Sequence, residues 1–117
     1  MIRGTTPTYT LTIEGQDLTD KTIYVTLKIG KNLMTLTNDR LSVVYSQQDQ
    51  KSIVAFTLTQ EETLSFKVGT GDVQVRFINA EGIAYATDIG KIEIDKVLLE
   101  RIIEYGGDSE EYNEGGE

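Results

Sequence analysis

Short segments in which apolar and polar residues alternate recur along this sequence of 117 residues, separated by loops of glycine and polar residues. Alternation with a period of two indicates a β-strand that buries one face. We expect strands at about 8–14, 22–28, 33–37, 41–46, 52–58, 64–68, 72–78 and 83–94. Seven or eight short strands at this regular spacing predict an all-β fold, an antiparallel β-sandwich in one domain.

The alternating segments offer a core for such a sandwich. Their β-branched and aromatic residues suit a pleated surface that is buried on one side. Burial of one large apolar side chain contributes about 1.5–3 kcal/mol, so the fold is stable only if the two sheets close on each other. The side chains that we expect to face inward are Tyr9, Leu11, Ile13, Val25, Leu27, Val54, Phe56, Leu58, Leu64, Val73, Val75, Phe77, Ile92 and Ile94.

Three connections between the predicted strands carry specific local chemistry. Asn79 and Gly82 bound a link that suits a type I turn with a glycine bulge, because glycine tolerates a positive φ. Thr59 and Glu62 have the spacing of a capping box, which predicts a short helical turn near 59–63. Residues 69–72 (Gly-Thr-Gly-Asp) lack the lysine and the following helix of a phosphate loop, and they are interpreted as a β-turn.

Residues 95–105 fit two structures. Asp95 is placed to cap a short helix that carries Leu98, Ile102 and Tyr105 on one stripe and ends at Gly106. The same segment also suits an extended conformation that pairs with a neighbouring molecule. The helix is the interpretation that the pattern favours.

The acidic charge of the chain is concentrated at its C-terminal end. The formal net charge is −8, and residues 104–117 contain six acidic residues and no lysine or arginine. Residues 1–103 therefore hold 13 acidic and 11 basic residues, a net charge of −2. The composition of residues 104–117 predicts a flexible acidic tail that is disordered in isolation. The chain has no clustered basic face to meet phosphates, so we expect no nucleic-acid partner.

Composition also limits the chemistry and the cellular setting. The chain contains no cysteine and no histidine, which removes disulfides, zinc-thiolate sites and the commonest general base. No apolar run approaches the ~20 residues that cross a bilayer, and no charged-then-apolar leader begins the chain. We therefore expect a soluble protein without a membrane partner or a secretion leader. We predict no enzymatic activity, no catalytic or metal-binding residue and no cofactor.

Two groups of acidic residues are candidates for active chemistry. Residues 61–62 (Glu-Glu) form an adjacent pair, but acid–base catalysis needs two carboxyl groups that face each other across a cleft, so a capping role is favoured. Asp17, Asp20, Asp39 and Asp49 lie in predicted loops that suit one end of a sandwich. Their spacing matches no calcium-binding loop, so solvated loop positions are favoured.

The residues before the first strand form a polar N-terminal arm. We predict the arm at residues 1–8, the β-sandwich domain at 9–103 and the acidic tail at 104–117. The sandwich can close without the arm, so we expect the arm to be mobile in the monomer. It would then order by adding to the sheet edge of a second molecule. The predicted interface residues are Arg3, Gly4, Thr5, Thr6, Pro7 and Thr8.

The start Met1-Ile2-Arg3-Gly4-Thr5-Thr6-Pro7-Thr8, followed by an alternating strand, resembles a family of small phage and prophage proteins of Gram-positive gut bacteria. Residues 58–66, 73–78 and 84–89 resemble the same family in order and spacing, so the resemblance covers roughly residues 1–95. It implies a virion structural protein, associated with the tail or baseplate, with an immunoglobulin-like or related β-sandwich. It supplies no catalytic residues.

The resemblance implies a non-enzymatic building block present in several copies, located in the virion and in the host cytoplasm before assembly. Its partners would be other virion structural proteins and further copies of itself. One alternative is a capsid decoration or head-attachment protein. Another is a module that binds host glycans through exposed tyrosines, for which the candidates are Tyr24, Tyr45, Tyr85, Tyr105 and Tyr112.

Overall fold

A computed structural model describes residues 1–106 of the chain, and these residues form a nearly all-β structure. The elements occur in the order β1 (Thr8–Glu14), β2 (Thr22–Ile29), β3 (Asn32–Leu36), the 3-10 turn η1 (Asn38–Arg40), β4 (Ser42–Ser46), β5 (Lys51–Thr57), α1 (Gln60–Ser65), β6 (Gly69–Ile78), β7 (Ala84–Ala86) and β8 (Gly90–Ile94). Among these residues no helix has the length and apolar character that a bilayer crossing requires.

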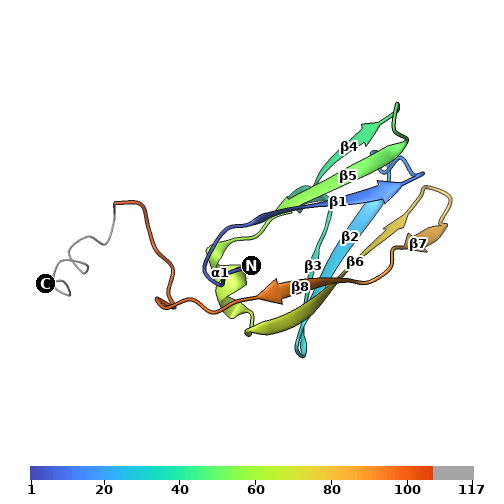
Figure 1. Cartoon of the computed structure of the whole chain (residues 1–117). Helices are drawn as coiled ribbons and strands as arrows, with labels where there is room; N and C mark the ends of the chain where they lie inside the picture. The colour runs from blue at the N-terminus through green and yellow to red at the C-terminus, as the bar shows by residue number, and fades with distance from the viewer. Residues whose placement is uncertain (107–117) are drawn as a thin grey trace, which may run out of the picture.

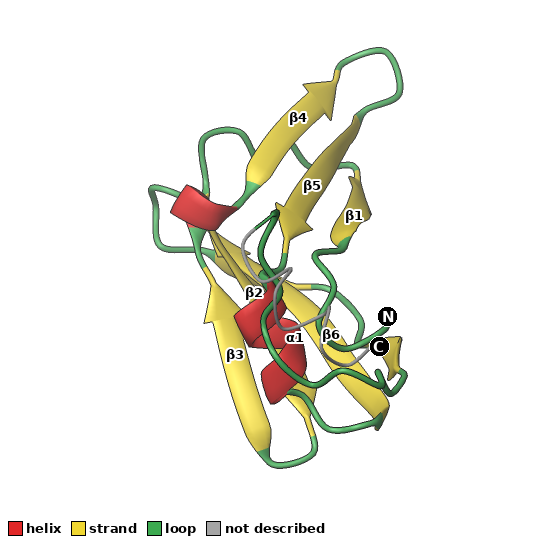
Figure 2. Cartoon of the chain, turned by 90° about the vertical axis from the view of Figure 1, so that its left-hand side faces the viewer, coloured by secondary structure: helices red, strands yellow, loops and turns green. Residues whose placement is uncertain are grey.

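The strands form two antiparallel sheets, as Figures 1 and 2 show. One sheet has the order β1-β5-β4, and the other has the order β3-β2-β6-β7, with β8 also paired to β6. This is the order in which an immunoglobulin-like sandwich places strands B, E and D in one sheet and C′, C, F and G in the other. The predicted β-sandwich is therefore confirmed.

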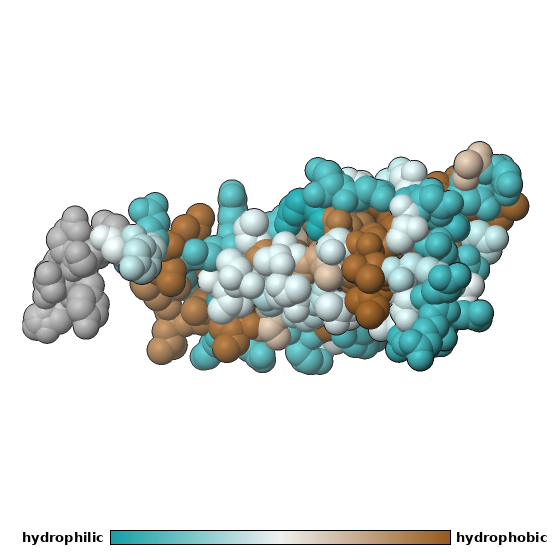
Figure 3. Space-filling view, turned by 90° about the horizontal axis from the view of Figure 1, so that it is seen from above, coloured by the Kyte–Doolittle hydropathy of each residue, from teal (hydrophilic) through white to brown (hydrophobic). Residues whose placement is uncertain are grey.

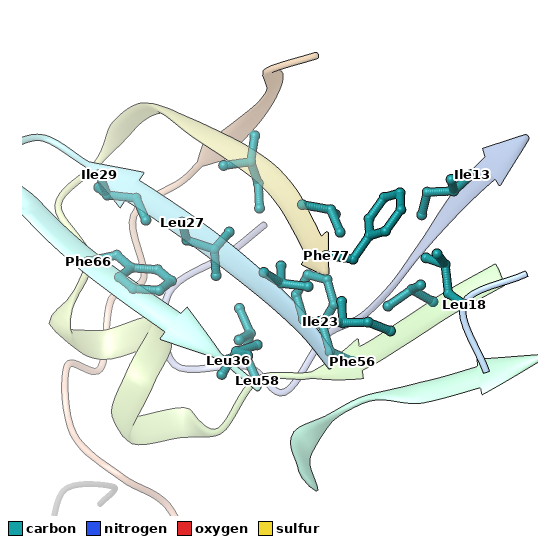
Figure 4. Close-up of a cluster of buried hydrophobic side chains, with 14 of the residues drawn as sticks. Ile13, Leu18, Ile23, Leu27, Ile29, Leu36, Phe56, Leu58, Phe66 and Phe77 are labelled. Atoms are coloured by element: carbon teal, nitrogen blue, oxygen red, sulfur yellow. The ribbon is translucent and has the colours of Figure 1, made fainter. Parts of the chain in front are cut away.

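The core lies between the two sheets and is built from the inward faces of both (Figure 4). The buried apolar side chains in the described residues are Ile13, Leu18, Ile23, Val25, Leu27, Ile29, Leu36, Val54, Phe56, Leu58, Phe66, Val75, Phe77, Ile92 and Ile94. Tyr9, Leu11 and Val73, which were also predicted to face inward, are partly buried and pack against this cluster.

Leu18 shows what the alternation pattern missed. It lies in a loop but is fully buried. The Ser52 hydroxyl accepts a hydrogen bond from the Leu18 amide at 3.0 Å and donates one to the Gln16 carbonyl at 2.7 Å. The loop is thereby fixed to β5, which places Leu18 in the core without any periodicity in its own sequence.

The predicted helical turn is confirmed, and it continues further than expected. The Thr59 hydroxyl accepts from the Glu62 amide at 3.1 Å, and the Glu62 carboxylate accepts from the Thr59 amide at 2.9 Å. Because α1 runs to Ser65, the strand predicted at 64–68 is wrong. Thr63 and Phe66, three residues apart, are the buried positions, and Leu64 is only half-buried.

The β-turn predicted at residues 69–72 is also wrong, because these residues begin β6 and pair with β8. The glycine at position 71 serves packing rather than a turn. A Cβ atom there would lie 2.7 Å from Ile29 Cγ1 and 3.0 Å from the Lys28 carbonyl oxygen. The hairpin at 79–82 is confirmed, since Asn79 and Ile83 are hydrogen-bonded and Gly82 has a φ of 86°.

The helix predicted at residues 95–105 does not form, and this part of the prediction is wrong. Asp95 makes an isolated parallel bridge with Ile2 instead of capping a helix. An isolated helix of this length is marginal in water unless its apolar stripe is buried. The segment instead leads away from the sandwich past α1 (Figure 1). Most of the predicted acidic tail, residues 107–117, lies outside the described residues.

Candidate functional site

The N-terminal arm, residues 1–8, lies against its own domain, between α1 and the residues that follow β8. The Arg3 amide donates to the Asp95 carbonyl at 3.0 Å, and the Asp95 amide donates to the Met1 carbonyl at 2.6 Å. The Leu58 amide donates to the Pro7 carbonyl at 3.0 Å, just before β1 begins. The expectation that the arm is mobile in the monomer is therefore wrong: the chain supplies its own partners for it.

Arg3 fixes the arm to the end of α1. Its guanidinium Nη2 donates to the Leu64 carbonyl at 2.5 Å, and its Nη1 lies 3.2 Å from the Glu100 carboxylate. The carbonyls of the last helical turn have no partner within the helix, so a basic side chain is well suited to this place. Arg3 thus joins three segments: the arm, α1 and the segment after β8.

Gly4 and Thr5 are held by one buried hydroxyl. Thr63 is fully buried, and its hydroxyl accepts from the Gly4 amide at 2.8 Å and donates to the Thr5 carbonyl at 2.9 Å. Gly4 has a φ of 81°, and a Cβ atom there would lie 3.2 Å from Leu64 Cδ2. Glycine is required at this position by the backbone conformation as well as by the close approach to α1.

The predicted interface residues differ in what they leave available to another molecule. Arg3, Gly4 and Pro7 are partly buried against the domain, whereas Thr5, Thr6 and Thr8 are exposed. The Thr8 hydroxyl pairs with that of Thr57 at 2.7 Å across β1 and β5. The outer surface of the arm, with Ile2 half exposed beside these threonines, is what remains for an intermolecular contact.

The acidic pair at residues 61–62 is not arranged as two facing catalytic carboxyl groups. The Arg40 guanidinium donates to both carboxylate oxygens of Glu62, each at 2.9 Å, and also to the Thr57 carbonyl at 3.0 Å. These hydrogen bonds from Arg40 lower the pKa of the Glu62 carboxyl, and that from the Thr59 amide acts in the same direction. The ion pair ties η1 to α1, which favours the structural role expected from the capping box.

The four loop aspartates also have local partners. Asp17 accepts from the Thr19 hydroxyl at 2.6 Å and from its amide at 3.0 Å, and these bonds lower the pKa of Asp17. Asp20 bonds to Lys21, Asp39 to Thr37 and Asp49 to Ser46. In the described part of the chain, no group of three or more acidic, cysteine or histidine residues is arranged to hold a metal ion.

Two surface hollows involve residues that the sequence singled out. One, of about 240 Å³, is lined by Tyr24, Arg76, Phe77, Ile78 and Ala84 on the larger sheet. Another, of about 480 Å³, lies between η1 and the β1–β5 pair and includes Thr8 and Arg40. Tyr85 stacks on Phe77 with ring centroids 5.2 Å apart, so much of its ring serves packing. Tyr112 lies outside the described residues.

The feature that sequence reasoning misread is the apolar segment, which we define as residues 98–105. Its five large apolar side chains are Leu98, Leu99, Ile102, Ile103 and Tyr105, and each is about half or more exposed, Leu98 at 95%. Figure 3 shows apolar surface, in brown, gathered at this end of the molecule. The pattern of apolar residues was visible in the sequence, but the sequence did not show that no part of residues 1–106 covers them.

Comparison with known families and curated proteins found no match: no known family model matches the chain, and no curated protein matches it. The functional assignment therefore depends on the site geometry and on the sequence resemblance described above.

Proposed function

We propose that this chain is a non-enzymatic structural protein of a phage virion, associated with the tail or baseplate and assembled in several copies. The observation that carries the proposal is the apolar segment. A monomeric domain rarely leaves five large apolar side chains exposed next to one another, and contiguous apolar surface of this kind marks protein interfaces. A protein whose role is to be built into a larger particle would cover this surface on assembly.

The sequence resemblance supports the same class of protein. In the structure, the stretches that carry the resemblance contact one another. The arm contacts the second resembling stretch, residues 58–66, through the Gly4–Thr63 and Arg3–Leu64 hydrogen bonds. The third stretch forms β6 and β7, which pair as a hairpin. The resembling stretches thus act as structural units of one sandwich, as expected for a scaffold whose sequence is constrained by packing and assembly.

The test is to locate the chain in purified virions. We expect protein analysis of the particles to find it at a fixed ratio to a major virion protein, and imaging of the intact particle to place it in the tail or baseplate. Its absence from purified particles would contradict the proposal. A position on the capsid surface would instead support a decoration or head-attachment protein.

The predicted interface on the arm has its own test within the same particles. Thr6 is exposed and its side chain makes no hydrogen bond within the described residues, so Thr6→Asp leaves the fold intact. We expect lower incorporation of the Thr6→Asp variant into particles, whereas Thr12→Asp, at an exposed position of β1, is incorporated normally. Equal incorporation of both variants would remove the arm from the interface.

A second candidate, a glycan-binding module, is favoured by one observation. The hollow of about 240 Å³ is lined by Tyr24, which is 42% exposed, and by Arg76 among others. An exposed aromatic ring beside a polar side chain is a suitable surface for stacking on a sugar. This function predicts that the full chain binds cell-wall glycan and that Tyr24→Ala abolishes binding, while Tyr105→Ala does not.

A further inference from the structure

The apolar segment is held by its backbone while its side chains face outward. The Gln60 side chain donates to the Ile103 carbonyl at 3.0 Å and accepts from the Ile103 amide at 2.8 Å. Nearer its start, Glu100 pairs with Arg3 at 3.2 Å. Two points of the segment are therefore fixed to the domain before any partner is present. Such preorganisation lowers the entropy that is lost when a segment docks on a partner.

The same chain carries a groove that fits an apolar segment. The β3–α1 groove, of about 410 Å³, is lined by Leu27, Ile29, Asn32, Leu33, Met34, Ser65 and Phe66. Among the strands of residues 1–106, β3 pairs only with β2, so its other side is an open sheet edge in this part of the chain. Leu33 stands on this strand with 67% of its side chain exposed.

Basic residues flank the groove, whereas the segment together with the sequence after it is predominantly acidic. Lys31 directly precedes the groove residue Asn32, and Lys67 directly follows Phe66. Both lysines are exposed, and neither forms an ion pair within residues 1–106. The apolar segment contains Glu100 and Glu104 with one basic residue, Arg101, and the sequence beyond it, residues 107–117, adds five acidic residues and no basic one. Complementary charges of this kind select the partner and orient its approach.

We propose that the apolar segment of one copy docks in the β3–α1 groove of a second copy of the same chain. Every copy brings one segment and one groove, so donor and acceptor are present in equal number. The acidic charge that accompanies the segment also disfavours the anionic membrane surface that would be the other apolar partner. Because donor and acceptor are different surfaces, the contact is heterologous and leads to a ring or a filament. This inference gives the proposed virion role its mode of self-association and depends on that role for its biological setting.

The test measures the mass of the full chain in solution by sedimentation velocity over a range of concentrations. The segment variant is Leu98→Asp, the groove variant is Leu33→Asp, and the matched control is Val44→Asp, which changes a side chain 59% exposed on the other sheet. We expect the wild type and Val44→Asp to associate as concentration rises. We expect Leu98→Asp and Leu33→Asp each to weaken association at least about tenfold. If Leu33→Asp unfolds the chain, Lys67→Glu replaces it as the groove variant.

Mixing the two variants gives the sharpest result. Leu98→Asp retains an intact groove and Leu33→Asp retains an intact segment, so an equal mixture should form a dimer and nothing larger. Any one of three results would overturn the inference. The wild type could stay monomeric at all concentrations, the groove variant could associate like the wild type, or the mixture could stay monomeric. The proposed virion role fails by a different readout, the absence of the chain from purified particles, so the two failures are distinguishable.

Discussion

The Thr63 hydroxyl holds the N-terminal arm against α1 together with the Arg3–Leu64 hydrogen bond. It is fully buried and serves both the Gly4 amide and the Thr5 carbonyl. Thr63→Val keeps the shape of the side chain but leaves these two backbone groups without their partner. Unsatisfied buried groups cost about 1–3 kcal/mol, and we expect the free energy of unfolding to fall by that amount. Urea denaturation followed by circular dichroism measures the change.

The control for Thr63→Val is Thr10→Val. Thr10 lies on the exposed face of β1, where its hydroxyl has no hydrogen-bond partner within the described residues. Surface changes of this type alter stability by about 0.5 kcal/mol or less. Equal effects of the two substitutions would mean that the Thr63 hydroxyl does not stabilise the arm.

The Arg40–Glu62 pair makes stability depend on pH. The pKa of Glu62 in the folded chain lies below its usual value of 4.5, chiefly because Arg40 donates hydrogen bonds to the ionised form. The ionised carboxylate therefore stabilises the fold above about pH 4.5, and this contribution is lost as the pH falls through the folded-state pKa. We expect Glu62→Gln to lower stability at neutral pH and to reduce the loss between neutral pH and about pH 3.

Denaturation at several pH values checks this prediction against Glu61→Gln. Glu61 occupies the neighbouring position of the first helical turn and has no hydrogen bond to Arg40. Glu61→Gln should keep the acid sensitivity of the wild type. The assignment to Glu62 is wrong if Glu62→Gln loses as much stability on acidification as the wild type does.

At the scale of the element, β6 is the strand on which the larger sheet depends, since it pairs with β2, β7 and β8. Gly71→Ala puts a Cβ atom 2.7 Å from Ile29 Cγ1, and overpacking of this kind costs about 1–3 kcal/mol. Gly90→Ala is the matched control, because its Cβ atom would meet Val73 Cγ1 at an ordinary 3.4 Å. Thermal unfolding should show a clear loss for Gly71→Ala only. Equal midpoints for the two variants would show that the strand shifts to make room.

The elements were predictable from sequence where period or local chemistry decided them. The strands at 8–14 and 22–28 and the capping box of Thr59 and Glu62 follow from alternation and from cap spacing. The turn predicted at residues 69–72 was wrong because the Gly-Thr-Gly run has the composition of a turn. The close approach of Ile29 to Gly71, which explains the glycine there, is a tertiary contact that the sequence does not show. The helix expected at 95–105 failed because its formation depends on a surface that would bury its stripe.

At the scale of the whole molecule, the arm joins the two sheets. Its first residues pair with Asp95 at the end of β8, in the five-stranded sheet, and its last residue begins β1, in the three-stranded sheet. Deleting residues 1–7 removes several hydrogen bonds, each contributing about 0.5–1.5 kcal/mol. We expect a total loss of about 2–4 kcal/mol in urea denaturation.

Hydrogen exchange locates the effect of this deletion. The amides of Leu58 and Asp95, which donate to arm carbonyls, should lose protection, while that of Val25 in the middle of β2 should keep it. An unchanged free energy of unfolding would show that the sandwich closes without the arm, as the sequence alone suggested.

The candidate site was predictable only in part, because its contacts join residues that are far apart in the sequence. The sequence located an unusual arm at residues 1–8, and its composition of glycine, proline and threonine suggested mobility. The partners that order it, the Thr63 hydroxyl and the Leu64 carbonyl, are more than fifty residues away in the sequence. No local sequence pattern predicts contacts at such separation, so the contacts of the arm are seen only in the tertiary structure.

The attachment of the apolar segment has a mechanical consequence. We expect a neighbour that pulls on this segment to load its attachment points before it loads the two sheets. The tension is borne first by the Gln60–Ile103 hydrogen bonds, next by the Arg3–Glu100 ion pair, and then by the bonds between Asp95 and the arm. These contacts form a series of weak links, and we expect them to yield in this order before β8 is loaded. We therefore expect the chain to lengthen under load at this end while its two sheets stay closed.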